Sequence, residues 1–172
     1  CSHEELCRLT YFAHSLHLSH KVPYASAMIN DVPTWVAAMP TVLAGSGIRY
    51  FSGGCNNTRA FTFNQLYDKC PCWWEGPDGS RVLMMFMPGY AHAEGLGLFN
   101  RLPGARERVL GTIRAYEGRK NYPYDAIFVN GGVGDNCALS AKLAEVVKAW
   151  NDRYEFPKII LCRNAEFFEH VE

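Results

Sequence analysis

The fold is decided by the stretch Tyr24-Ala25-Ser26-Ala27-Met28-Ile29-Asn30-Asp31-Val32-Pro33, in which an uncharged run ends in two polar residues and a proline. A run without charges is typical of a parallel strand covered on both faces. Pro33 ends the strand, because proline has no N–H to donate to a ladder. Asp31 is therefore expected in a loop after a strand, where β/α barrel enzymes carry catalytic groups. The alternative is that Asp31 caps a helix that begins near Thr34.

On both sides of this stretch, helical and strand patterns alternate. Apolar spacing of three and four residues predicts helices over 4–20, 36–44, 104–117, 138–153 and 165–171, and short apolar runs predict strands over 24–29, 48–51, 126–129 and 158–162. The helix over 4–20 is expected to cover the core with one buried stripe. The segment from Cys72 to Met87 predicts a hairpin, because Gly76-Pro77-Asp78-Gly79 suits a turn. The alternation indicates an α/β fold with parallel strands, either a barrel or an open doubly wound sheet.

Composition sets limits on the class of protein. The chain has 172 residues, of which 48% are hydrophobic and 20% charged, as expected for one globular domain over residues 1–172. Seventeen basic and seventeen acidic side chains balance, and no basic stripe is interleaved with aromatic residues, so a nucleic-acid partner is not expected. No apolar run approaches the roughly 20 residues that cross a bilayer, so no membrane partner is expected either. The cellular compartment stays open.

The first residue is Cys1 rather than methionine. Helical periodicity follows it almost at once. We therefore expect the chain to be a piece of a longer polypeptide, with the remainder of that parent chain as a partner of the domain.

The seven cysteines predict neither a disulfide framework nor a zinc knuckle, because their number is odd and no two are spaced as Cys-x-x-Cys. Most are expected to be small buried apolar residues. The pair in Cys70-Pro71-Cys72 is too tightly spaced for an ordinary bridge within the chain.

A second carboxylate follows a strand at Asp135, after the glycine run Gly131-Gly132-Val133-Gly134. Two carboxylates that flank one bond are what glycoside hydrolysis requires. The alternative is that Asp135 caps the helix that begins near Ala138. A phosphate cradle is less favoured, because the glycines lack the Gly-x-Gly-x-x-Gly order of a dinucleotide site.

Aromatic residues and one histidine are candidates for contact with a substrate. The candidate platforms for the apolar face of a sugar are Trp35, Tyr90, Trp73 and Trp74. Trp73 and Trp74 must point to opposite faces of their strand, so at most one of these two faces a given pocket. His92 follows the second hairpin strand in a loop of small residues, where it is either a substrate or metal contact or a structural histidine.

Four segments, taken in this order, resemble glycoside hydrolase family 38, which contains retaining α-mannosidases. They are Asn30-Asp31-Val32-Pro33-Thr34-Trp35, the run from Met39 to Tyr50, the run from Trp74 to Leu83, and Gly134-Asp135-Asn136. The resemblance extends from about residue 20 to the C-terminus. It implies a fragment of a seven-stranded β/α barrel with a β-hairpin insertion.

The resemblance also implies roles for single residues. Asp31 takes the position of the nucleophile, which is also a zinc ligand, and Asp135 that of the general acid/base. Tyr90 and His92 fall in the segment that contacts the sugar. The chain departs from the family where Asp31-Val32-Pro33 replaces Asp-Pro-Phe-Gly and where Asn136 replaces the second aspartate of Gly-Asp-Asp.

The family's His-x-Asp zinc pair and its last zinc histidine have no counterpart in the sequence. The resemblance therefore implies that the remaining zinc ligands lie outside residues 1–172, and that this piece alone binds zinc poorly and is inactive. We expect a zinc-dependent retaining glycosidase whose substrate is a carbohydrate. The rivals are a noncatalytic carbohydrate-binding relative and, third, a metal-dependent deacetylase on a related barrel.

Overall fold

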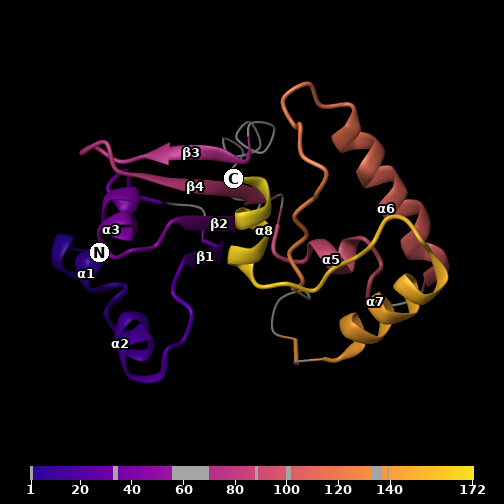
Figure 1. Cartoon of the computed structure of the whole chain (residues 1–172), viewed down its shortest axis with the longest axis horizontal. Helices are drawn as coiled ribbons and strands as arrows, with labels where there is room; N and C mark the ends of the chain where they lie inside the picture. The colour runs from indigo at the N-terminus through magenta and orange to yellow at the C-terminus, as the bar shows by residue number, and fades with distance from the viewer. Residues whose placement is uncertain are drawn as a thin grey trace.

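A single sheet forms the centre of the computed structural model, which describes residues 2–32, 35–55, 70–87, 89–99, 102–132, 137–138 and 140–172. The sheet has four strands in the order β1-β2-β4-β3 (Figure 1). Strands β1 (Ser26–Asp31), β2 (Tyr50–Cys55) and β4 (Arg81–Met87) are parallel, and β3 (Cys72–Glu75) runs antiparallel to β4. The described part of the protein is thus a mixed α/β structure, as the alternating sequence pattern predicts, and the sheet that its residues form is open.

The helices are α1 (His3–Arg8), α2 (Tyr11–His20), α3 (Met39–Gly45), α5 (His92–Gly95), α6 (Leu102–Glu117), α7 (Lys142–Arg153) and α8 (Asn164–Val171). Both faces of the sheet are covered. The Tyr50 ring stacks on Phe168 of α8, with ring centroids 5.1 Å apart. The next residue, Phe51, meets Trp35 edge to face at 5.0 Å. Since neighbouring strand residues point to opposite faces, α8 and Trp35 lie on opposite sides of β2.

The predicted hairpin is confirmed. Gly79 adopts a left-handed φ of 84°, which a glycine accepts without strain. The Oγ1 hydroxyl of Thr41 in α3 donates to Asp78 Oδ1 at 2.5 Å, so the hairpin turn is tied to the helix that links β1 and β2. Hydrogen bonds from the Thr41 hydroxyl and from the hydroxyl and backbone N–H of Ser80 hold the pKa of Asp78 at about 2, below its usual 3.8.

A second apolar cluster lies beside the sheet, among α5, α6 and α7 (Figure 1). Its centre is Trp150 of α7, which is 1% exposed and donates its indole N–H to the Pro157 carbonyl oxygen at 2.7 Å. Helices α6 and α8 match the predicted ranges closely, and α7 begins four residues later than expected. No helix in the described part of the chain is both long and apolar enough to cross a bilayer.

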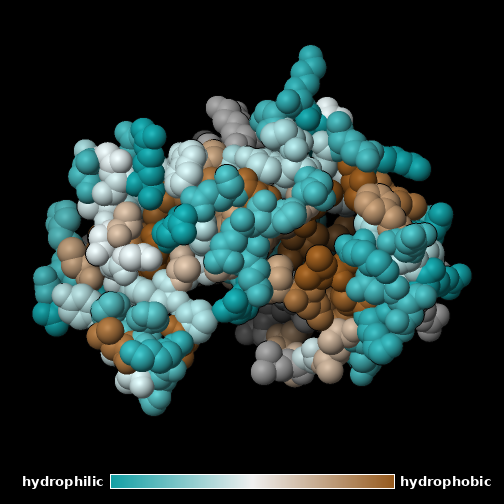
Figure 2. All heavy atoms as spheres, in the orientation of Figure 1, coloured by the Kyte–Doolittle hydropathy of each residue, from teal (hydrophilic) through white to brown (hydrophobic). Residues whose placement is uncertain are grey.

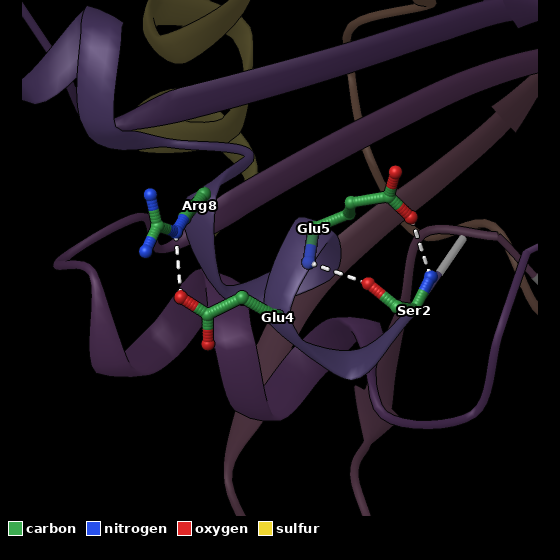
Figure 3. Close-up of polar contacts among 4 residues, drawn as sticks. All are labelled: Ser2, Glu4, Glu5 and Arg8. Carbon is green, nitrogen blue, oxygen red and sulfur yellow. Dashed lines mark hydrogen bonds and ion pairs between the residues drawn. The ribbon is translucent and has the colours of Figure 1, made fainter.

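The single covering helix expected over residues 4–20 is wrong. The chain forms two helices that are interrupted at Thr10, whose hydroxyl contacts Ser46 Oγ at 2.8 Å, and this tertiary contact holds the break. Helix α1 is closed by a capping box, in which Ser2 Oγ accepts from the Glu5 N–H at 3.2 Å and the Ser2 N–H donates to Glu5 at 2.6 Å (Figure 3). Helix α2 buries no residue, Phe12 is 75% exposed, and apolar side chains show on its surface (Figure 2).

The strands expected over 126–129 and 158–162 are wrong as well, because these segments join no ladder among the described residues. One cause is that β3 pairs with Arg81 to Met84, so it occupies the edge of β4 on which a further parallel strand would add. Phe128 is buried against Phe167 and Phe168 instead, and Ile160 is 77% exposed.

Candidate site at the carboxyl edge of the sheet

Three parallel strands end at the same edge of the sheet. The register places Asp31 level with Cys55, and Gly54 level with Met87. The segments that leave β1, β2 and β4 therefore start side by side. In open and closed α/β sheets alike, ligands bind at the carboxyl ends of the strands, so this edge is the first place to look for a site.

Asp31 ends β1 in an unusual conformation. Its φ is 67°, and the N–H of Val32 donates to the Asn30 carbonyl oxygen at 2.8 Å across it. A hydrogen bond from residue i+2 to residue i around a positive φ is the rarer, strained form of γ-turn. Asp tolerates a left-handed φ better than most residues, although such backbone still costs about 1–3 kcal/mol. Asp31 is thus the last residue of β1, level with Cys55, rather than a residue of the following loop as expected, and it is exposed.

The capping interpretation of Asp31 is wrong. Helix α3 begins at Met39, and its N-cap residue is Ala38, which lies seven positions after Asp31. The helix that Asp135 was expected to cap begins at Lys142 with Ala141 as its N-cap. Asp135 itself lies outside the described residues.

A loop after β4 packs against the strand ends. A Cβ atom added to Gly54 would lie 2.9 Å from Asn30 Oδ1 and 3.1 Å from the carbonyl carbon of Gly89. Glycine at position 54 thus lets the Asn30 side chain and the loop backbone meet over the end of β2. Tyr90 and His92 follow in this loop.

The segment that precedes Asp135 reaches the same loop. The Ala93 N–H donates to the Asn130 carbonyl oxygen at 3.0 Å, and the Gly132 N–H donates to Asn130 Oδ1 at 3.0 Å. A side chain at Gly132 would collide with the Tyr90 carbonyl oxygen. Residues 130–132 therefore lie against residues 90–93, although nearly 40 positions separate them in the sequence.

Three buried polar atoms in this region have no hydrogen-bond partner among the described residues: Asn30 Oδ1, Asn130 Nδ2 and His92 Nδ1. A buried polar group without a partner costs about 1–3 kcal/mol, so such atoms call for an explanation. One is an acceptor, one is a donor, and the histidine nitrogen takes either role according to its tautomer. A ligand with several hydroxyl groups matches such a set.

Burial lowers the pKa of His92 below its usual 6.5, so its ring is neutral at pH 7. The unfolded chain takes up this proton near pH 6.5, whereas the folded chain resists it. The stability that neutral His92 contributes is therefore complete above pH 6.5 and is lost as the pH falls through the lowered folded pKa.

We expect the free energy of unfolding in urea to fall more steeply below about pH 6.5 for the natural protein than for a His92→Gln variant. Glutamine keeps a polar side chain at this position but does not titrate. Two curves that run parallel from about pH 8 to pH 5 would show that His92 is not buried as described.

The aromatic candidates have different environments. Tyr90 and His92 lie in the loop at the sheet edge, beside Asn130. The Trp35 indole lies instead over the backbone of Gly53, where no side chain intervenes. The centroid of its ring is 5.7 Å from that of Phe86 and 5.9 Å from that of Trp74. Trp73 is 53% exposed while Trp74 packs on the core, which confirms that the two tryptophans point to opposite faces.

Sequence reasoning missed Asn30 and Asn130 as site residues. Each follows an apolar run directly, at Ile29 and Val129, and each brings an amide to the end of that run. The place of each asparagine, directly after an apolar run, is the sequence signal that could have identified it as a site residue. Among the described residues, no three His, Cys, Asp or Glu side chains gather closely enough to hold a metal ion.

Comparison with protein-family models, with curated proteins and with solved structures gives no match to this chain. The candidate site therefore rests on its own geometry and on the resemblance of its sequence motifs.

Proposed function

We propose that this chain is part of a retaining glycoside hydrolase that acts on α-mannosides or related glycosides. The observation that carries the proposal is the strained turn at Asp31, which holds an exposed carboxylate at the carboxyl edge of three parallel strands. Strain of this kind gathers at functional sites, because the surrounding structure must maintain it.

The sheet is proposed to be a fragment of a seven-stranded β/α barrel. In support of this, β1, β2 and β4 are parallel neighbours in chain order, as successive barrel strands are. The antiparallel strand β3, which forms the hairpin with β4, is then the inserted strand.

The proposed reaction uses two carboxylates. Asp31 attacks the anomeric carbon as the bond to the leaving oxygen breaks, and Asp135 donates a proton to that oxygen. In the second step Asp135 takes a proton from water, the water oxygen bonds to the anomeric carbon, and Asp31 is released. The reaction requires Asp135 to lie near Asp31. In support of this, residues 130–132, which precede Asp135, contact the loop that begins beside Asn30.

The neutral polar atoms suit the rest of the sugar. Asn30 Oδ1 accepts a hydrogen bond, and Asn130 Nδ2 donates one. Together with His92 they are proposed to bind the ring hydroxyls, and Tyr90 lies in the same loop. Unpaired site groups of this kind discriminate strongly against ligands that lack the matching hydroxyl.

A zinc ion belongs to the proposal through the family resemblance alone. Asp31 would be one ligand, and when bound the ion would orient substrate hydroxyls and stabilise charge. The described residues do not complete a ligand set, and none of the steps above uses the metal.

The proposal is tested by incubating the full-length natural protein with an aryl α-mannoside and following the first-formed sugar by NMR. The expected product is the α-anomer, because two inversions retain configuration. A β-anomer as first product, or no hydrolysis at all, would contradict the assignment.

The alternative is a noncatalytic carbohydrate-binding relative. It is favoured by the three neutral polar atoms, which bind hydroxyls without any acid. Calorimetric titration with mannose or a mannoside separates the two functions, because binding by the alternative survives simultaneous replacement of Asp31 and Asp135 by asparagine and is accompanied by no hydrolysis.

A further inference from the structure

Two thiols come together at the start of β3. Cys70 and Cys72 flank Pro71, and their Sγ atoms lie 3.9 Å apart. This distance is that of a hydrogen bond between two thiols, and it is far longer than a disulfide bond. The spacing of Cys70 and Cys72 in the sequence is too close for an ordinary disulfide, yet their two sulfur atoms are in contact.

The surroundings of the pair hold it in place. Cys70 is 2% exposed, and the backbone of Phe86 hydrogen-bonds to it. Cys72 is half-buried, so solvent and ions reach the pair at Cys72 rather than at Cys70. The sulfurs thus lie at the edge of the apolar core rather than on an open surface.

A third sulfur shares the face. Cys72 is directly opposite Met84 in the antiparallel ladder, and paired residues point to the same side of the sheet. Met84 is buried at 5% exposure. The Cys72 thiol, which contacts the Cys70 thiol, and the Met84 thioether therefore come from paired positions on one face of β3 and β4.

Ligands of this kind select metal ions by softness. Thiolate and thioether sulfur favours Cu(I) over hard cations such as Mg²⁺ and Ca²⁺, which prefer oxygen. We propose that Cys70 and Cys72, with Met84, form a binding site for a soft monovalent metal ion such as Cu(I). Binding replaces the thiol protons, which leave to solvent, and changes no oxidation state. The site is independent of the proposed glycosidase chemistry.

The test is anaerobic titration of the whole protein with Cu(I) in the presence of a coloured Cu(I) chelator. The protein should withdraw one equivalent of Cu(I) from the chelator. A Cys72→Ser variant should bind at least about 100-fold more weakly, since even changes outside the ligand shell cost 10–100-fold. Met84→Leu, which keeps the volume but removes the sulfur, should show a smaller loss.

Matched controls come from the exposed cysteines. Cys137→Ser and Cys162→Ser remove a thiol elsewhere, so they should leave the withdrawn equivalent unchanged. X-ray absorption of the natural protein loaded with Cu(I) needs no variant and should report sulfur neighbours alone. Unchanged binding by Cys72→Ser, failure of the natural protein to compete with the chelator, or nitrogen and oxygen neighbours would each overturn the proposal.

Discussion

Asp31→Asn is expected to lower kcat for an aryl α-mannoside by on the order of 10⁴-fold, because the amide cannot serve as the nucleophile. The fold should survive the change. Asparagine has nearly the same shape as aspartate and also accepts the left-handed φ of 67° found at this position. The measurement is steady-state hydrolysis by the full-length natural protein and its variant, with urea unfolding of both.

Asp152→Asn is the matched control. Asp152 is an exposed carboxylate of α7, paired with Lys148 at 2.7 Å, and a surface pair of this kind contributes about 0–1 kcal/mol. Its replacement should leave kcat unchanged. If Asp31→Asn retains the activity of the control variant, Asp31 is not the nucleophile.

Trp35→Ala is expected to destabilise the protein by about 3 kcal/mol, because the change removes an indole that packs on the sheet core. The indole closes the space above Gly53 and contacts the Phe51 and Phe86 rings. The free energy of unfolding from urea titration measures the effect.

Trp73→Ala removes the same side chain from a position that is 53% exposed, so its cost should be much smaller. The comparison also separates two roles of Trp35. A sugar platform predicts weaker binding with stability intact, whereas a packing residue predicts lost stability. Equal stability of the two variants would contradict the packing role.

The sequence predicts the elements whose signals are local. The hairpin follows from Gly76-Pro77-Asp78-Gly79, and α8 follows from its apolar spacing, so both appear close to where they are expected. The strand expected over 24–29 appears as β1 for the same reason, although it lies two residues further along the chain, at Ser26–Asp31. Each of these elements is specified by residues within its own span.

The errors arise where distant contacts decide the structure. The helix expected over 4–20 breaks because Thr10 meets Ser46, which lies 36 positions away. An apolar run at 158–162 predicts a buried strand, but whether it finds a partner depends on edges formed by other segments. Periodicity carries no information about either contact.

In the candidate site too, the sequence predicts what local residues determine and misses what distant contacts determine. Asp31 could be placed at a strand end from sequence, but its left-handed turn could not, because aspartate also occupies ordinary loop conformations. The approach of Asn130 to the loop at Ala93 depends on tertiary packing. Asp135 lies outside the described residues, so its convergence with Asp31 stays a prediction.

The central claim is that Asp31 forms a covalent bond to the sugar. The most direct measurement uses a fluorinated mannosyl fluoride that forms the glycosyl-enzyme rapidly but releases it slowly, followed by peptide mass spectrometry of the full-length natural protein. We predict that the added sugar mass is on the peptide that contains Asp31 and is absent from the Asp31→Asn variant. A label on any other peptide, or turnover of the natural protein without a label, would contradict the account.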